Sequence, residues 1–114
     1  MNAYLQEAEI AVVKLEGEID ANTAPKIQAE IGPLTQAKRN LMLDFTRVNY
    51  MSSSGLRLLL SLHRQALKLN VNLALVGLSS ELQDTMAVVG FLDFFNTYET
   101  LDVAMAALEE KGKG

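Results

Sequence analysis

The chain of 114 residues has no cysteine, no tryptophan, one histidine and two prolines. The lack of cysteine excludes disulfides, thiolate catalysis, thiolate zinc sites and iron–sulfur clusters. With one histidine, a metal would need carboxylates, and the nearest acidic run, at 16–20, is better interpreted as a solvated turn. No apolar run approaches the ~20 residues of a membrane helix, and the start lacks the features of a signal peptide. We therefore expect a cytoplasmic protein without a cofactor or metal.

The residues that are present have an ordinary globular composition. Apolar residues make up 49% of the chain and charged residues 21%, which favours a folded domain over disorder. The net charge is −4; residues 31–70 carry six bases and one acid, and both flanking segments are acidic. Such a chain is a poor candidate for direct nucleic-acid binding. The length predicts one domain, at 1–110, and a flexible tail at 111–114.

Apolar strands and amphipathic helices alternate along the chain. Strands are predicted at 4–7, 10–15, 41–45, 71–76 and 94–98, and helices at 23–31, 54–69, 80–89 and 101–108. Single helices between successive strands imply crossover connections and a largely parallel sheet of an α/β protein. Gly32-Pro33 is expected to end the first helix, and a capping box at Ser80-Glu-Leu-Gln83 is expected to begin the third.

The longest predicted helix, at 54–69, carries two stripes of opposite character. Leu56, Leu60, His63 and Leu67 share one face and predict its buried side, whereas basic and polar residues share another face and predict its solvated side. On this apolar stripe, His63 is expected to be a core or boundary residue rather than a functional one.

Three loops, at 17–22, 46–53 and 77–80, follow the carboxyl ends of the predicted strands. In a parallel sheet these loops share one edge of the molecule, where functional groups gather. The second loop contains the most unusual peptide, Tyr50-Met-Ser-Ser-Ser-Gly-Leu-Arg57, which leads into the longest helix. Serines commonly cap a helix start, but one cap requires one serine, and three are present.

The other residues of this peptide point to a partner. Gly55 costs the helix up to ~1 kcal/mol relative to alanine, and it lets another backbone approach closely. Tyr50 and Met51, if exposed, offer an apolar contact. These features predict that a partner docks at this turn or modifies it.

A phosphate on one of these serines, for example Ser54, would be tolerated inside the domain, because a helix start favours negative charge. Arg57, three residues on, lies on the same helix face and either pairs with that phosphate or is a solvated surface position. Ser54 is a poor catalytic nucleophile, since His63 lies nine residues along the same helix, about 13.5 Å away by helical rise. The sequence also lacks the Gly-x-Ser-x-Gly elbow and the Gly-x-x-x-x-Gly-Lys phosphate loop.

The same residues resemble a known family. Tyr50-Met-Ser-Ser-Ser-Gly-Leu-Arg57, preceded by the apolar strand at 41–45, is similar to the phosphorylation motif of STAS domains, the sulphate transporter and anti-sigma factor antagonist family. Gly17-Glu-Ile-Asp20, followed by Thr23-Ala24, resembles the other recurrent segment of that family. The resemblance covers about residues 4–110. It implies the STAS fold, a four- to five-stranded, mostly parallel sheet with about four helices.

The resemblance also implies partner switching. The unmodified antagonist binds an anti-sigma factor, usually a serine kinase related to histidine-kinase ATPases, and this binding frees a sigma factor. Phosphorylation by that kinase separates the pair, and a serine phosphatase resets it. By the motif, Ser54 is the phosphoacceptor and Asp20 matches a position of kinase contact. Ser52 stands where the family commonly has aspartate, so that Ser52 and Ser53 are the alternative acceptors.

We therefore predict an anti-sigma factor antagonist that is not an enzyme, and that is a monomer or weak homodimer. Its partner-binding residues would be Asp20, Tyr50, Met51, Ser52, Ser53, Gly55 and Arg57, around Ser54, and Ser53 would also be the local cap of the helix. One alternative is a constitutive STAS scaffold subunit of a transporter or a stressosome-type assembly. Another is a sensor of small ligands or nucleotides at the strand ends. A receiver-type domain fits poorly, because its magnesium-binding carboxylates are missing.

Overall fold

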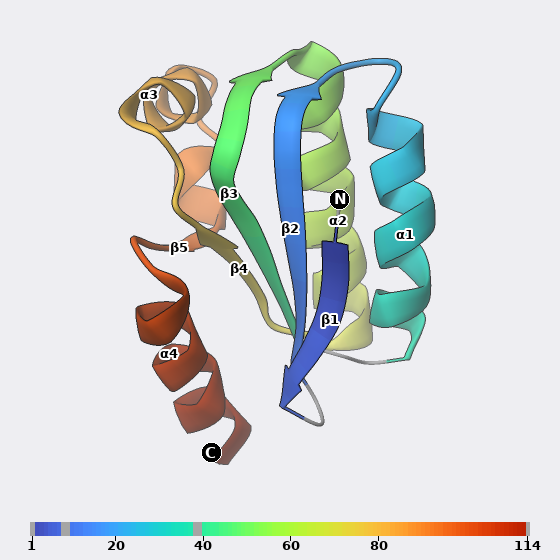
Figure 1. Ribbon diagram of the computed structural model, residues 1–114, viewed down its shortest axis with the longest axis vertical. Helices are drawn as coiled ribbons and strands as arrows, with labels where there is room; N and C mark the ends of the chain where they lie inside the picture. Colours follow the sequence, from blue (N-terminus) through green and yellow to red (C-terminus); the bar gives the residue numbers. More distant parts are fainter. Residues whose placement is uncertain (1, 8–9, 38–39, 114) are drawn as a thin grey trace.

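The computed structural model describes residues 2–7, 10–37 and 40–113, with side chains for 10–37 and 40–109 (Figure 1). Its strands are β1 (Asn2–Glu7), β2 (Ile10–Ile19), β3 (Asn40–Met51), β4 (Leu73–Val76) and β5 (Asn96–Tyr98). Its helices are α1 (Ala24–Gln36), α2 (Ser53–Leu69), α3 (Ser80–Val88) and α4 (Leu101–Lys113), with a 3-10 turn, η1 (Leu92–Phe94). All the strands and helices expected from the sequence are present.

The strands form one sheet in the order β1-β2-β3-β4-β5. β1 runs antiparallel to β2, and the other neighbouring pairs are parallel. Each parallel pair is joined through one helix, as crossover connections require. The predicted α/β fold, with a mixed and mostly parallel sheet and four helices, is confirmed.

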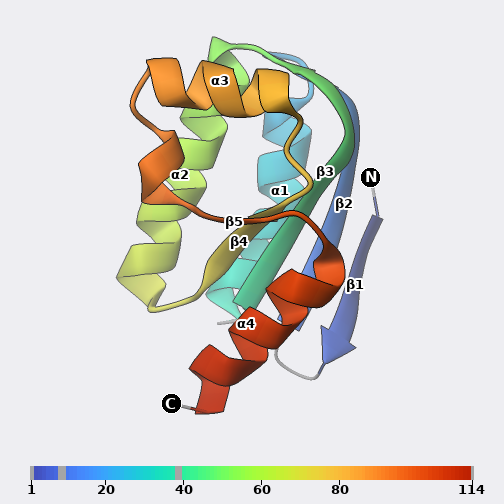
Figure 2. The same ribbon diagram turned by 90° about the vertical axis from the view of Figure 1, so that its left-hand side faces the viewer.

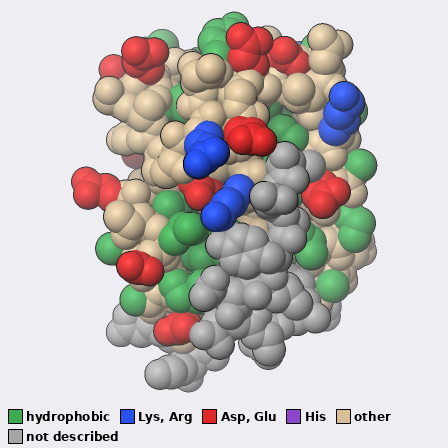
Figure 3. All heavy atoms as spheres, in the orientation of Figure 1, with side chains coloured by type: hydrophobic (Ala, Val, Ile, Leu, Met, Phe, Trp, Pro, Cys, Tyr) green, Lys and Arg blue, Asp and Glu red, His purple; other side chains and the backbone are tan. Residues whose placement is uncertain are grey.

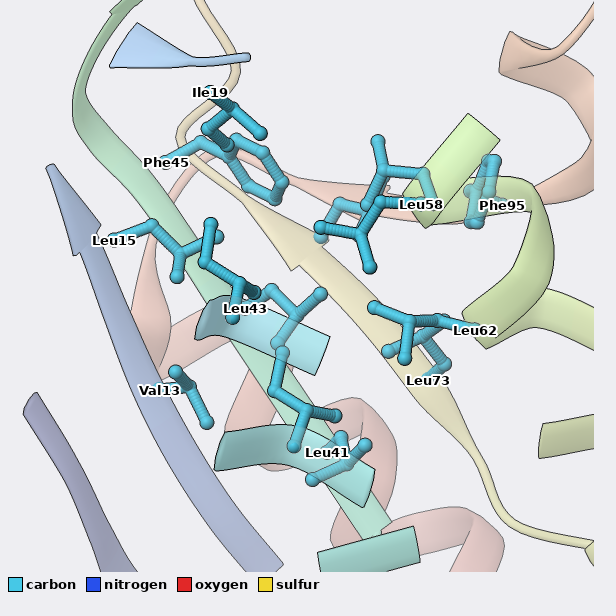
Figure 4. Close-up of a cluster of buried hydrophobic side chains, with 14 of the residues drawn as sticks. Val13, Leu15, Ile19, Leu41, Leu43, Phe45, Leu58, Leu62, Leu73 and Phe95 are labelled. Carbon is cyan, nitrogen blue, oxygen red and sulfur yellow. The ribbon is translucent and has the colours of Figure 1, made fainter. Parts of the chain in front are cut away.

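The two faces of the sheet are covered differently. α1 and α2 lie side by side on one face, whereas α4 lies against the other (Figures 1 and 2). Alternate strand residues explain the division: Leu41 and Leu43 join the core under α1 and α2, while Met42 joins a smaller cluster with Ala104 and Leu108 of α4. Figure 4 shows the larger cluster, in which strand residues such as Val13 and Phe45 point toward the helices.

β2 and β3 extend well beyond β4. The last pair between β3 and β4 is Asp44 with Val76, but β3 continues to Met51 and stays paired with β2. Half of the loop predicted at 17–22 and most of the loop predicted at 46–53 are therefore strand, and the two strands end together at one tip of the sheet. The loop predicted at 77–80 leaves the sheet further down, at the level of Asp44. Two of the three predicted loops therefore meet at the tip of the sheet, and the third does not reach it.

The first helix does not end at Gly32-Pro33, contrary to the prediction. Gly32 has no Cβ to clash with the proline ring, which lowers the usual cost of helical backbone before proline. Thr35 is buried and its hydroxyl donates to the Gly32 carbonyl at 2.8 Å, while Ile31 is buried one turn earlier. Packing against the core therefore carries α1 through Pro33 to Gln36.

The buried face of α2 also differs from the predicted stripe. The helix buries Gly55, Leu58, Leu59, Leu62 and Ala66, with Leu56 at the margin. The predicted Leu67 is 69% exposed, and His63 is half-buried, its ring stacked on Phe94 at a centroid distance of 5.7 Å. The helix has leucines on several of its faces. The face that packs against the sheet is the one that also carries the small residues Gly55 and Ala66. His63 is a boundary residue, as expected.

The third helix is capped slightly earlier than predicted, and the fourth helix extends beyond its predicted end. α3 is capped by Ser79, whose side-chain oxygen accepts from the Leu82 N–H at 3.1 Å, so that the cap lies one residue before the predicted box. α4 ends at Lys113, and Gly114 lies outside the described residues. The domain boundary at residue 110 stays a prediction.

Replacing Leu62 with alanine tests the face of α2. We expect Leu62→Ala to lower the free energy of unfolding by about 2–5 kcal/mol, because it opens a cavity in the core. Leu67→Ala is the matched control on the same helix, and we expect a change within about 0.5 kcal/mol. Chemical denaturation of the two variants measures both values. Equal losses would contradict the orientation of α2.

Candidate functional site

The site lies where β2 and β3 end together. Ile19 pairs with Met51 in the last register position, and the Ser52 N–H donates to the Ile19 carbonyl at 2.8 Å. Asp20 and Ser52, the next residue of each strand, therefore emerge side by side. α1 and α2 begin within a few residues of this point and lie on the same face of the sheet (Figure 1).

Asp20 organises the turn that leads into α1. Its Oδ1 accepts from the N–H groups of Asn22 at 2.9 Å and Thr23 at 3.0 Å. These two backbone hydrogen bonds, that from Thr23 first, hold the pKa of the Asp20 carboxyl below its ordinary value. Thr23 is the N-cap residue, but its side chain does not cap the helix and instead accepts from the Asp20 N–H at 2.9 Å. The Asp20 side chain therefore fixes the turn that precedes α1 and does not itself cap the helix.

The three serines have different environments at the start of α2. Ser52 is the N-cap, and its side-chain oxygen accepts from the Ser54 N–H at 3.2 Å. Ser53 is exposed, and Ser54 is half-buried. Capping therefore uses the first serine, not Ser53 as expected, and the hydroxyls of the other two are not needed for it.

Ser54 and Arg57 are in direct contact. The Arg57 Nη2 donates to the Ser54 Oγ at 3.1 Å across one turn of α2. Since arginine only donates, the hydroxyl hydrogen of Ser54 is not used in this bond and can point elsewhere. The predicted proximity of the two residues is thus present, and the oxygen of Ser54 is not sealed in the interior.

Gly55 and Met51 face inward rather than toward a partner. A Cβ on Gly55 would overlap Met51 Cγ and lie 3.0 Å from Ile19 Cγ2 and 3.1 Å from the Ile19 carbonyl oxygen. Met51 itself is only 4% exposed. The close approach that Gly55 allows is therefore made by its own chain, and Met51 does not offer an exposed docking surface. Both residues hold the start of α2 against the strand ends.

Tyr50 is exposed, as the docking interpretation requires. Its side chain is 54% exposed, and its register partner on β2 is Glu18. Tyr50 does not line the hollow beside Ser54, which is formed by the starts of the two helices.

That hollow is a shallow groove of about 330 Å³ between α1 and α2. It is lined by Ala21, Ala24, Pro25, Gln28, Ser54, Arg57 and Leu58. Sequence reasoning missed the four residues before and within α1. The topology contained the signal, because two helices that follow adjacent parallel strands on one face begin next to each other.

The arrangement suits binding better than catalysis. Among the side chains that the structure describes, the hydrogen-bond partner of the Ser54 hydroxyl is the guanidinium of Arg57, which is not a base. Over the same residues, no group of three or more His, Cys, Asp or Glu could hold a metal ion. No described helix is long and apolar enough to cross a bilayer.

The opposite face of the sheet is polar where α4 does not cover it. A hollow of about 370 Å³ is lined there by Lys14, Leu15, Glu16, Asp44, Thr46 and Arg47. Figure 3 shows positive and negative side chains close together on this face. Asp44 is buried and accepts from the Thr46 N–H and hydroxyl at 2.9 and 2.8 Å. This hollow lies across the sheet from Ser54.

Comparison with known proteins places the chain in a family. The model of the STAS domain matches residues 3–104. The anti-sigma-B factor antagonist of Listeria monocytogenes is 35% identical over 79 residues, which are 68% of each chain.

Solved structures agree with this match. An anti-sigma factor antagonist from Mycobacterium paratuberculosis superposes with a TM-score of 0.82 at 25% identity, over 95% of this chain and 93% of that one. The anti-sigma factor antagonist SpoIIAA of Bacillus has been solved unphosphorylated (TM-score 0.81, 20% identity, 96% of both chains) and phosphorylated (0.75, 21%, 94% and 97%). The chain therefore belongs to the STAS domain family, and the Listeria, Mycobacterium and Bacillus proteins that it resembles are anti-sigma factor antagonists.

Proposed function

We propose that the protein is an anti-sigma factor antagonist that works by phosphorylation-dependent partner switching. Its unphosphorylated form binds an anti-sigma factor and thereby releases a sigma factor. The anti-sigma factor is also a serine kinase of the histidine-kinase-like ATPase type, and it phosphorylates Ser54. The modified protein then dissociates, and a serine phosphatase restores it. The protein itself acts by binding and not by catalysis.

The observation that carries this proposal is the position of Ser54. Its half-buried hydroxyl lines the groove between the starts of α1 and α2, so that a partner seated there would contact it directly. Phosphorylation adds about −1.5 to −2 charges at pH 7 at that point. A partner that fits the unmodified groove would then face a charge it does not match.

The fold tolerates the phosphate at this place. α2 has 17 residues and no acid in its first turn, so that the partial positive charge of its start is not already neutralised there. The hydroxyl of Ser54 accepts a hydrogen bond from the exposed Arg57 and does not help to hold the core together. Modification therefore changes the surface offered to a partner much more than it changes the stability of the domain.

The geometry favours Ser54 over its neighbours as acceptor. The Ser52 oxygen serves as the cap of α2, so that modifying it would disturb the helix start. Ser53 is exposed but does not line the groove. Ser54 alone of the three is both accessible and part of the groove.

Replacing Ser54 with alanine tests the acceptor. In the native cell, or with ATP and the kinase captured from it, we expect wild-type protein and Ser53→Ala to be phosphorylated and Ser54→Ala to remain unmodified. Mass spectrometry of the peptide across 47–57 identifies the modified serine. Label that persists in Ser54→Ala would move the acceptor to another residue. Tight binding with no phosphorylation of any variant would favour the constitutive scaffold.

Replacing Ser54 with aspartate tests the switch. We expect Ser54→Asp to weaken binding of the captured anti-sigma factor at least tenfold, or about 1.4 kcal/mol. The melting temperature should barely change, because a negative charge suits this end of the helix. The control is Ser61→Asp, an exposed serine on the same helix, for which binding should stay as in the wild type. A collapse of the melting temperature in Ser54→Asp would show that Ser54 is chiefly structural.

Two replacements of Asp20 separate its structural role from docking. Asp20→Asn keeps an oxygen that can accept from Asn22 and Thr23 but removes the charge, whereas Asp20→Ala removes both. If Asp20 contacts the partner, Asp20→Asn binds the anti-sigma factor more weakly and melts close to the wild type. Asp20→Ala should also melt at a lower temperature. Wild-type affinity in Asp20→Asn would remove Asp20 from the docking surface.

The same variants carry a pH prediction. The folded-state pKa of Asp20 lies below its ordinary value of 3.8, so that its ionised form stabilises the fold above that pH. This contribution is lost as the pH falls through the folded-state pKa. We therefore expect the stability of the wild type, measured by urea unfolding from pH 5 down to pH 2, to fall more steeply than that of Asp20→Asn. Parallel curves would contradict the cause assigned to the shift.

A further inference from the structure

Arg57 is the one charged side chain that lines the groove beside Ser54. It is exposed, and its Nη2 lies 3.1 Å from the Ser54 Oγ. A hydrogen bond from a guanidinium to a neutral hydroxyl uses only one of five N–H donors. Most of the binding capacity of Arg57 is therefore unused by its contact with Ser54.

The stability of α2 does not explain an arginine at this position. The start of a helix carries partial positive charge, and an arginine in the second turn does nothing to compensate it. No acid lies in the first turn of α2 to compensate it. Among the side chains that the structure describes, no carboxylate forms an ion pair with Arg57. Arg57 is thus placed where it suits an anion that the unmodified protein does not supply.

We propose that Arg57 is a phosphate clamp, which binds the phosphate on Ser54 back onto α2. The inference rests on the proposed function in taking Ser54 as the residue that is phosphorylated. The phosphoryl oxygens are attached through the same Oγ that Arg57 already contacts, so that small side-chain rotations bring them within reach. Guanidinium and phosphate can form two parallel hydrogen bonds, which are shorter and stronger than the present one.

The clamp changes the groove in two ways at once. The phosphate brings about −1.5 to −2 charges, and the paired arginine cancels one of them, which leaves about −0.5 to −1. Arg57, which the unphosphorylated protein presents to a partner as a cation, is also neutralised by its pairing with the phosphate. Phosphorylation therefore removes a cation from the docking surface as well as adding an anion.

The test measures the phosphate directly. Phosphoserine is placed at position 54 during synthesis of the full chain, with no kinase, in the wild type and in Arg57→Gln. The second pKa of the phosphate, ordinarily near 6, is then measured by phosphorus NMR titration. We expect it to be lower in the wild type than in Arg57→Gln by roughly half a pH unit or more, since the nearby cation favours the dianion.

Two control variants separate contact from general charge. Arg64→Gln removes an exposed arginine further along α2, and its phosphate should titrate as in the wild type. Arg57→Lys keeps the charge but not the fork of donors, and its phosphate should titrate between the wild type and Arg57→Gln. Phosphorylation should also raise the melting temperature of the wild type more than that of Arg57→Gln.

The same phosphate pKa in the wild type and Arg57→Gln would overturn the clamp, as would an equal change in Arg64→Gln. Neither result bears on whether a kinase uses Ser54, because the phosphoserine is supplied by synthesis. Conversely, failure of the kinase to label Ser54 contradicts the proposed function and leaves the titration unaffected. The two proposals can therefore fail separately.

Discussion

The pairing of β2 with β3 through their last residues is the constraint on which the site depends. It places Ile19 beside Met51, and α2 can begin directly over this pair only because Gly55 has no side chain. Ser54 and Arg57 are fixed by that helix start, and Asp20 by the strand that it follows. Any larger residue at position 55 would push α2 away from the sheet and separate the two halves of the groove.

The sequence was sufficient to predict the order of the elements, the parallel pairing and the serine peptide at a helix start. These features depend on local periodicity and on crossover topology, which a single chain displays directly. The contact between Ser54 and Arg57 was predictable for the same reason, since helical spacing alone brings residues three apart together. The proximity of Asp20 to this peptide followed from the pairing of adjacent strands.

Features decided by tertiary packing were not predictable in this way. Pro33 did not end α1, because Ile31 and Thr35 bind that turn to the core. The leucines of α2 occur on several faces, and the face that packs on the sheet is the one that contains Gly55, where a side chain would not fit. For the same reason Met51 and Gly55, expected at the docking surface, turned out to be buried. A small residue at a predicted helix start should first be interpreted as making room for packing within the protein, and only then as making room for a partner.

The composition of the groove bears on the entropy of binding. Its α1 side is built from Ala21, Ala24 and Pro25, which have no rotamers to lose when a partner covers them. Pro25 also lies in the first turn of α1, where its ring fixes the backbone. Ordering therefore costs most at the long side chains of Gln28 and Arg57. The α1 side of the groove is therefore as rigid before a partner binds as it is afterwards. Such a surface favours fast association without rearrangement.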